Sequence, residues 1–243
     1  MLIDGAHPEE IRIVVANDSL IEELDHETST KNQNKGNIYL AKVMRVEPSL
    51  RAAFVDYGNN RHGFLPFSEI HPNYFQIPVS DKEKLLNEDK SLEQTETNHL
   101  NNEEVFSGDS EQKIKQASIR RSKLYSKYKI QEVISRKQIL LVQVVKEERG
   151  NKGAALTTYL SLAGRYCVLM PNSNRSGGVS RKINNPADRK RLKSVVSELD
   201  IADGMAVIVR TAGSKRTKTE IKRDYSYLTK LWNDIRSNTM KSE

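Results

Sequence analysis

The chain has 243 residues, a formal net charge of +7 and a pI of about 9.3, so it is long enough for one or two domains with a real core. The positive surplus favours a polyanionic partner, RNA or DNA before a membrane surface, although a merely basic globular protein fits it too. The single cysteine, Cys167, excludes an internal disulfide and a cysteine zinc cluster, and we expect it to be a small buried residue. Acidic residues occupy the start and no apolar run reaches the length of a membrane helix, so we expect a cytoplasmic protein.

The first predicted strand lies in the segment IRIVVAND, residues 11–18, where Ile11, Ile13 and Val15 share one face. A turn at Asn17-Asp18 follows, and residues 20–24 are compatible with a return strand. Two strands do not form a stable domain by themselves. We therefore expect their partners elsewhere in the chain, or in a part of the protein that is absent here.

Three short strands are predicted in the next stretch, at residues 37–46, 52–57 and 61–66. In the first of them, Tyr39, Ala41, Val43 and Arg45 fall on one face and the residues between them on the other. A short helical turn is expected over residues 68–75. Short strands at this spacing predict a small barrel.

Residues 81–128 do not continue this rhythm. The first part is rich in Glu, Asp, Asn, Thr and Ser with almost no core-forming residues, and the part from Lys113 to Lys137 is strongly basic. We interpret the segment as an inserted and largely disordered loop. Its basic half is suited either to contact with RNA or to a solvated, weakly helical arm.

Residues 146–170 form the stretch around which the chain is organised. A charged turn at residues 147–153, with two glycines around Lys152, separates strands predicted at 138–145 and 154–162. Glycine permits backbone angles closed to other residues and the close approach of a flat ligand. An ordinary hairpin loop explains the same spacing equally well.

The last third of the chain predicts two helices and a strand. Asn185 as a cap and Pro186 as first helical residue begin a helix whose apolar stripe includes Leu192 and Leu199. Residues 205–209 are predicted to form a strand, and residues 219–235 a helix in which Trp232 is a packing residue.

Phe54 and Phe64 lie on neighbouring predicted strands, in the segments AAFVDYG and GFLP. Aromatic rings on the outer face of a barrel form stacking platforms for unpaired bases. Nearby side chains would add to the site, with phosphate contacts from Lys42, Arg61 and Lys152 and with Tyr57 and His62 close by. Alternation alone favours, by a small margin, the alternative that both rings belong to the barrel core.

The stretch GNIYLAKVMRVEPSLRAAFVDYGNNRHGFLP resembles an S1-type RNA-binding domain, which is a five-stranded OB barrel. Joined to KEERGNKGAALTTYLSLAGRYCVLMPN and VIVRTAG, it resembles the amino-terminal half of the ribonuclease E/G family. The resemblance covers nearly the whole chain except residues 81–128, and the long block from Lys146 to Asn172 is highly specific.

This resemblance implies a mainly β fold with α+β parts, in which an S1-type barrel is inserted in an incomplete RNase H-like fold. Residues 1–35 would be the first RNase H-like strands, and residues 36–160 the S1 domain with its disordered insert at 81–128. A small α/β 5′ sensor would occupy residues 161–213. Residues 214–243 would return to the RNase H-like part.

The family's functional residues map onto seven positions. Phe54, Phe64 and Lys152 match the S1 contacts to single-stranded RNA. The 5′-monophosphate pocket matches Gly164, Val168, Arg210 and Thr211. An arginine fork grips phosphate oxygens bidentately, a hydroxyl adds a donor, and a glycine lets the terminal nucleotide approach the backbone.

The family cuts RNA with Mg²⁺ held by aspartates in a DNase I-like subdomain beyond the sensor, and zinc bound by downstream cysteines joins subunits. The chain ends at Glu243 before both regions, so we expect Mg²⁺ and Zn²⁺ only for the full-length family. Within residues 1–243 we expect no catalytic and no metal-binding residue, and the sequence leaves open whether the chain is an enzyme.

Two hypotheses about function follow, with a third behind them. The chain is the RNA-binding portion of an endoribonuclease that acts in rRNA and tRNA maturation and mRNA turnover. Alternatively, it is a non-catalytic S1-type RNA-binding protein, the remnant of a split or truncated ribonuclease gene. The sensor motifs disfavour a general S1 protein of translation. The expected partner is single-stranded RNA with a 5′-monophosphate, and a homo-oligomer or a separately encoded catalytic half is compatible with the resemblance.

Overall fold

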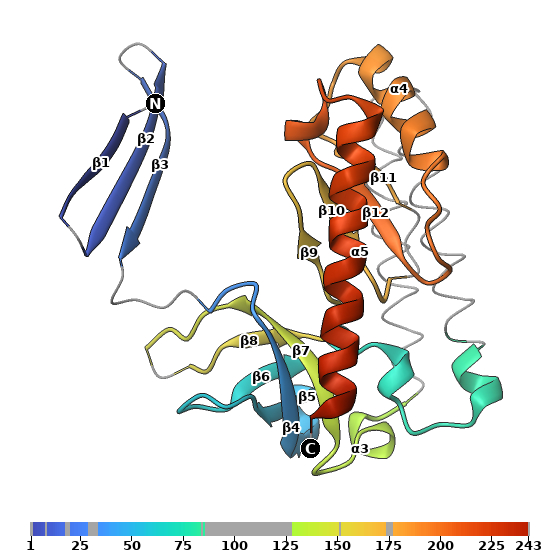
Figure 1. Ribbon diagram of the computed structural model, residues 1–243. Coiled ribbons are helices and arrows are strands. Elements are labelled where there is room, and N and C mark those ends of the chain that lie inside the picture. The colour runs from blue at the N-terminus through green and yellow to red at the C-terminus, as the bar shows by residue number, and fades with distance from the viewer. Residues whose placement is uncertain are drawn as a thin grey trace, which may run out of the picture. The chain divides into compact units, whose positions relative to one another are not determined.

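The structure is a computed structural model that describes residues 2–7, 9–17, 20–28, 34–83, 85, 128–150, 152–173 and 177–242 (Figure 1). The chain separates into two compact units, Met1–Lys35 and Gly36–Glu243. The second unit carries both a closed barrel and a four-stranded sheet.

The first unit is a three-stranded antiparallel sheet in the order β1 (Leu2–His7), β2 (Glu10–Asn17) and β3 (Leu20–Thr28). The strands predicted within residues 11–18 and 20–24 are confirmed as β2 and β3. Strand β1 was not predicted, because Asp4 and Gly5 interrupt its apolar alternation, yet it pairs with β2 from Leu2↔Val14 to His7↔Glu10. Apolar side chains on this sheet remain exposed, among them Leu2, Ile3, Ile11, Ile21 and Leu24.

The barrel contains β4 (Ile38–Glu47), β5 (Ala52–Asp56), β6 (Gly63–Pro66), β7 (Ile139–Lys146) and β8 (Ala155–Thr157). It closes in the order β4-β5-β6-β8-β7. Strands β6 and β8 are parallel, and the other neighbours are antiparallel. This arrangement confirms the predicted five-stranded OB-like barrel within a mainly β fold.

Short helical segments flank the barrel strands in the chain, namely η1 (Pro48–Leu50), η2 (Phe67–Glu69), η3 (Pro72–Tyr74) and α3 (Ile130–Val133). The single strand predicted at residues 154–162 is wrong. Strand β8 ends at Thr157, because the next residue turns away: the Thr158 amide donates to the Glu69 carbonyl (2.9 Å) and the Leu160 amide to Asn172 Oδ1 (2.9 Å).

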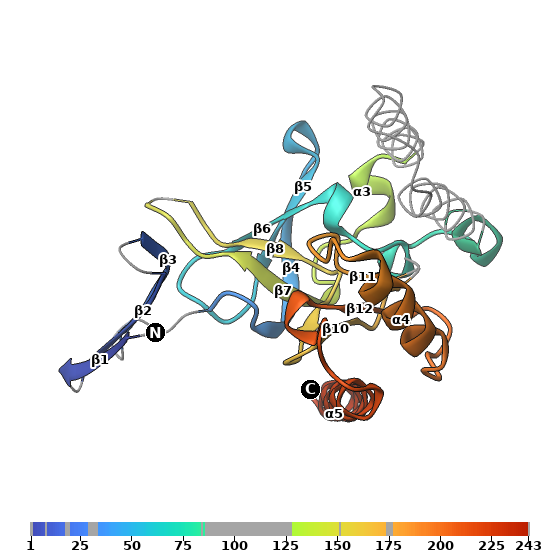
Figure 2. The ribbon, with the colours of Figure 1, turned by 90° about the horizontal axis from the view of Figure 1, so that it is seen from above.

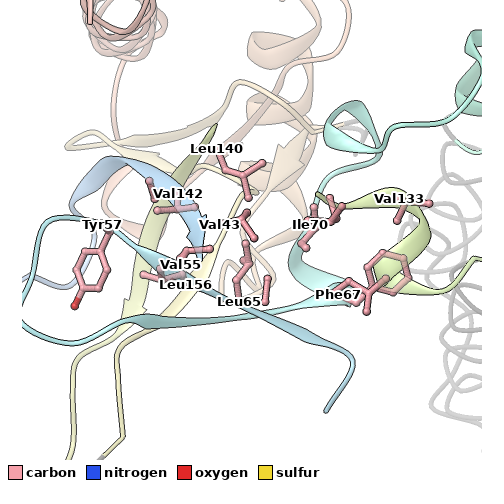
Figure 3. Packing of buried hydrophobic residues seen from close by; sticks show 14 of the residues in the cluster. Val43, Val55, Tyr57, Leu65, Phe67, Ile70, Val133, Leu140, Val142 and Leu156 are labelled. Atoms are coloured by element: carbon pink, nitrogen blue, oxygen red, sulfur yellow. The ribbon is translucent and has the colours of Figure 1, made fainter. Parts of the chain in front are cut away.

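The barrel core is built from one face of each strand (Figure 3). Its fully buried side chains include Val43, Val55, Leu65, Leu140 and Val142. Leu85 is buried in the same cluster and Tyr128 packs against it. Both ends of the segment predicted as a disordered insert therefore belong to the barrel, whereas residues 84 and 86–127 lie outside the described residues.

The second sheet of this unit has the order β11-β12-β10-β9, from β9 (Leu162–Ala163), β10 (Cys167–Met170), β11 (Gly178–Val179) and β12 (Ala206–Val209). Helices α4 (Pro186–Ser197) and α5 (Lys218–Lys241) bury their apolar stripes in one cluster with it, as Figure 1 shows for α5 beside β9 and β10. Asn185 caps α4 as predicted, since its Oδ1 accepts from the Ala187 amide at 3.0 Å.

Helix α5 extends six residues beyond the predicted end at 235, and a capping box of Thr217 and Glu220 begins it. Trp232 packs against the cluster as predicted. Among the described helices, none combines the length and the apolar character needed to cross a membrane.

One buried amide joins the barrel to the start of the sheet. The Gln143 Nε2 group on β7 donates to the carbonyls of Gly36 (2.8 Å) and Ser161 (2.9 Å), and its Oε1 accepts from the Ser161 amide (2.8 Å). A buried polar side chain is stable only when its donors and acceptors are paired. Gln143 therefore fixes where the chain leaves the barrel for β9.

Candidate nucleic-acid interface

Phe54 on β5 and Phe64 on β6 face each other directly across the two strands. Their ring centroids are 5.9 Å apart with the rings inclined at 66°, an edge-to-face pair. Both rings are partly exposed and belong to neither buried cluster of the described residues. The inward positions are taken by their neighbours Ala53, Val55 and Leu65. The alternative that the two rings form barrel core is therefore wrong.

The aromatic pair belongs to a row of cross-strand neighbours on the outer surface of the barrel. Arg45 on β4 pairs with Phe54, Phe64 pairs with Ala155 on β8, and Ala155 pairs with Lys146 on β7. The Arg45 guanidinium carbon lies 4.8 Å from the centre of the Phe54 ring. Exposed cations at both ends of an aromatic pair suit a single strand, whose phosphates alternate with stackable bases.

The strand pairing is irregular at both ends of this row, and these irregularities determine on which face Arg45 and Lys146 lie. Between Val43 and Arg45, and between Val144 and Lys146, the register shifts by one residue. Without the first bulge, strict alternation would place Arg45 on the same face as Val43, which is the arrangement predicted from the sequence. The prediction for Arg45 is wrong because a β-bulge reverses which face a side chain takes.

Lys152 lies exposed in the turn between β7 and β8, where its backbone forms a bridge with Arg149. Gly150 has φ +58, which favours glycine, and a Cβ at Gly153 would lie 2.0 Å from the His62 carbonyl oxygen. These glycines let the turn lie against the start of β6, the strand that carries Phe64. Among the described residues no ion pair or side-chain hydrogen bond engages the Lys152 ammonium group.

Four further side chains named from the sequence divide into two kinds. Lys42 and His62 are exposed. Arg61 instead donates to the Gly150 carbonyl, and the buried Tyr57 donates its hydroxyl to Glu148 Oε1 at 2.9 Å. Burial is the main cause that raises the pKa of Tyr57 above its ordinary value. Tyr57 and Arg61 thus connect the loop between β5 and β6 to the turn between β7 and β8. These hydrogen bonds use the two groups within the protein instead of leaving them for a ligand.

The residues expected to hold a 5′-monophosphate lie on β10 and in the segments that follow β9 and β12. Arg210 follows β12, where its amide donates to the Tyr166 carbonyl (2.8 Å) and its Nη1 to the Gly164 carbonyl (2.7 Å). Val168 pairs with Ile208 on β12, and Thr211 begins η4 (Thr211–Gly213) directly after Arg210. The structure brings Gly164 and Arg210 into contact, and it leaves Arg210 and Thr211 exposed.

A buried carboxylate that was not predicted organises this loop. Asp224 on α5 accepts hydrogen bonds from the amides of Arg165 (3.2 Å), Tyr166 (2.8 Å) and Cys167 (2.8 Å). The only signal for it in the sequence is one acidic residue between Ile221, Tyr225 and Leu228 on the apolar stripe of α5. Cys167 is fully buried as predicted, and burial together with the Asp224 charge raises the pKa of its thiol to about 12.

Magnesium and zinc, which the resemblance associates with the full-length family, have no candidate ligand set in the described part of the chain. Among those residues, no three His, Cys, Asp or Glu side chains gather as metal ligands would.

A closed five-stranded barrel with an outward aromatic pair between exposed cations is an S1-type OB barrel, a class of single-strand nucleic-acid-binding domain. The sequence agrees: the S1 RNA binding domain matches residues 32–95, and the Ribonuclease E/G family matches residues 161–243. The chain belongs to the ribonuclease E/G family.

Curated relatives align with almost the entire chain. Ribonuclease E of Haemophilus influenzae is 40% identical over 236 residues, which cover 97% of this chain and 20% of the relative. Ribonuclease E of Escherichia coli K12 is 38% identical over 236 residues, 97% of this chain and 18% of the relative. Ribonuclease G of the same strain is 31% identical over 234 residues, 96% of this chain and 39% of the relative. The chain thus spans about a fifth of the length of these two ribonuclease E relatives.

Proposed function

We propose that this chain is the RNA-binding portion of a ribonuclease E/G-type endoribonuclease, and that it binds single-stranded RNA across β5 and β6. The observation that carries the proposal is the outward pair Phe54 and Phe64 with Arg45 at one end and Lys146 at the other. Bases stack on the two rings, and Lys152 supplies a phosphate contact from the neighbouring turn. Each stacked base contributes roughly 1–3 kcal/mol to binding.

In this proposal, residues 1–35 belong to an RNase H-like domain, 36–160 to the S1 domain, 161–213 to a 5′ sensor and 214–243 again to the RNase H-like part. The exposed apolar residues of β1 to β3 support the first assignment, since such a sheet needs further packing. The protein as a whole cuts RNA during rRNA and tRNA maturation and mRNA turnover. A stand-alone S1 module is the less favoured reading, because residues 161–243 match the ribonuclease E/G family and the relatives that align with nearly the whole chain are ribonucleases.

The same proposal assigns the 5′-terminal monophosphate to Arg210 and Thr211, with Gly164 and Val168 beside them. Arg210 uses one terminal nitrogen on the Gly164 carbonyl, which orients the guanidinium and leaves its other donors for phosphate oxygens. A 5′-hydroxyl offers this fork no charge to neutralise. A monophosphate end is therefore favoured over a hydroxyl end by about tenfold to a hundredfold.

The experiment is a binding titration with purified chain and fluorescent A/U-rich oligomers of one sequence, single-stranded or annealed, each with a 5′-hydroxyl. The proposal predicts tight single-strand binding and much weaker duplex binding, because paired bases cannot stack on the rings. Equal affinity for both forms would show that the positive charge alone attracts nucleic acid. Adding a 5′-monophosphate should strengthen binding in the parent and in Arg223→Ala, an exposed control on α5, but not in Arg210→Ala.

A further inference from the structure

An open groove lies beside the aromatic pair, between the end of β4 and the turn that follows α3. It encloses about 590 Å³ and is lined by Arg45, Val46, Gln131, Ile134, Ser135 and Arg136. This volume lies in the range of roughly 300–1,000 Å³ that is typical of small-ligand sites. Helix α3 contacts β4, and Figure 2 shows it on the side of the barrel where β4 and β5 extend.

The groove combines an apolar floor with a polar and cationic rim. Ile134 is 2% exposed and Val46 is half-buried, whereas Arg45, Gln131 and Arg136 are exposed. The turn that carries the rim is held in place, since Ser135 Oγ donates to Gln76 Oε1 at 2.7 Å. A ribose and base need an apolar surface with a few polar partners, and a phosphate needs a cation, so this lining suits one nucleotide.

The two arginines of the rim are oriented and available. Arg136 Nε donates to the Met44 carbonyl at 3.2 Å, so its two terminal nitrogens remain for a ligand. Arg45 lies over the Phe54 ring on one side and lines the groove on the other. In the part of the chain that the structure describes, neither guanidinium forms an ion pair. The nearby carboxylate of Glu132 is not among the lining residues, and it accepts from the Lys129 amide.

From these contacts we infer that the groove binds the nucleotide next to the base stacked on Phe54, and that Arg136 holds a phosphate of the RNA together with Arg45. The inference rests on the proposed function and extends it. The strand runs from the Lys152 turn across Phe64 and Phe54 to Arg45, and then into the groove over Val46 and Ile134. The interface is thereby longer than the two-ring platform and has its own cation at the far end.

The discriminating substitution is Arg136→Ala, because Arg136 contacts neither phenylalanine. With a single-stranded oligouridylate that carries a 5′-hydroxyl, we expect about fivefold weaker binding at low salt. The slope of log affinity against log salt should fall by about 0.7, the value for one phosphate on a single strand. Gln131→Glu, which places a carboxylate in the groove and leaves both arginines, should weaken binding as well. Arg223→Ala removes the same charge from exposed α5 and should bind like the parent.

The inference about the groove fails if Arg136→Ala and Gln131→Glu both keep the affinity and salt slope of the parent while Phe54→Ala binds more weakly. That result would leave the proposed function standing. If Phe54→Ala and Phe64→Ala bind like the parent, the proposed function itself fails, and with it a strand that continues from Phe54. Thermal unfolding of each variant identifies any loss of folded protein, so that affinity is compared only among folded chains.

Discussion

The Asp224 carboxylate occupies the space that a side chain at Gly164 would need. A Cβ on residue 164 would lie 2.5 Å from Asp224 Oδ2 and 2.8 Å from Oδ1. The family resemblance assigns this glycine to the approach of a terminal nucleotide, yet the packing of α5 against the loop already requires a glycine here. The buried carboxylate and the glycine thus form one structural unit that positions the carbonyl to which Arg210 donates.

Replacing Gly164 by alanine should destabilise the protein. The new methyl group displaces the Asp224 carboxylate from the amides of residues 165–167, at a cost of roughly 1–3 kcal/mol in the free energy of unfolding. Urea unfolding followed by circular dichroism measures this change. Gly178→Ala is the matched control, since nothing lies within 4 Å of a Cβ at that position. Equal stability of the two variants would contradict the proposed role of the close contact.

Substitutions at Asp224 should show a graded effect. Alanine removes the acceptor of three amides, each of which costs about 1–3 kcal/mol if it stays buried without a partner. Asparagine keeps one oxygen acceptor and so should cost less than alanine. The exposed Asp203→Ala on the loop before β12 serves as control. A stability of Asp224→Ala close to that of Asp203→Ala would show that the loop does not depend on the carboxylate.

Cys167 should resist thiol reagents in the folded protein. Its thiol is fully buried and its pKa is raised to about 12 by burial and by the Asp224 charge, so almost no thiolate is present at neutral pH. Because the chain has a single cysteine, the reaction with Ellman's reagent reports on this residue alone. We expect slow reaction in buffer and rapid reaction in denaturant. Rapid reaction under native conditions would place the thiol at the surface.

Two barrel tyrosines should make the protein less stable in strong alkali. Burial raises the pKa of Tyr57 and of Tyr74 above the ordinary value of 10.0. The folded state therefore keeps the phenol protons more tightly than the unfolded state does. The resulting stabilisation is fully present below about pH 10 and is lost as the pH rises through the folded-state pKa values.

The measurement for this pair is the free energy of unfolding as a function of pH above about 9. Tyr74→Phe should flatten the alkaline decline, although it also removes the hydroxyl that accepts from the Leu141 amide (3.2 Å). Tyr227→Phe, a change at an exposed position on α5, is the matched control for the removal of a phenol hydroxyl outside the barrel. An identical alkaline slope in the parent and in Tyr74→Phe would mean that the Tyr74 phenol does not titrate differently in the folded and unfolded states.

The barrel could be predicted from the sequence because its strands alternate and its turns contain glycine, proline or asparagine. The orientation of Phe54 could not, since Ala52, Ala53, Phe54 and Val55 are all apolar and either face could have been the inner one. The outward orientation of Arg45 depends on a bulge between β4 and β5, and no residue type in the sequence indicates that bulge. Local alternation identifies a strand, whereas register requires knowledge of the partner strand.

The residues of the expected 5′ sensor could likewise be predicted only in part from the sequence. The strand and turn that carry Arg210 were visible as an apolar run followed by polar residues and a glycine. Asp224 was not recognised, because it lies nearly sixty residues after the loop that it stabilises and its neighbours on α5 are ordinary packing residues. Long-range hydrogen bonds of this kind leave no local pattern. They become visible only when the helix and the loop are placed together.

The central claim is that the outward aromatic pair binds single-stranded RNA, and the most direct measurement is the affinity of Phe54→Ala and Phe64→Ala for a single-stranded A/U-rich oligomer. Each variant should bind more weakly than the parent by roughly 1–3 kcal/mol while its melting temperature stays close to that of the parent, since neither ring lies in the core. Tyr227→Ala, which removes an exposed ring from α5, should bind like the parent. Unchanged affinity in both folded phenylalanine variants would contradict the claim.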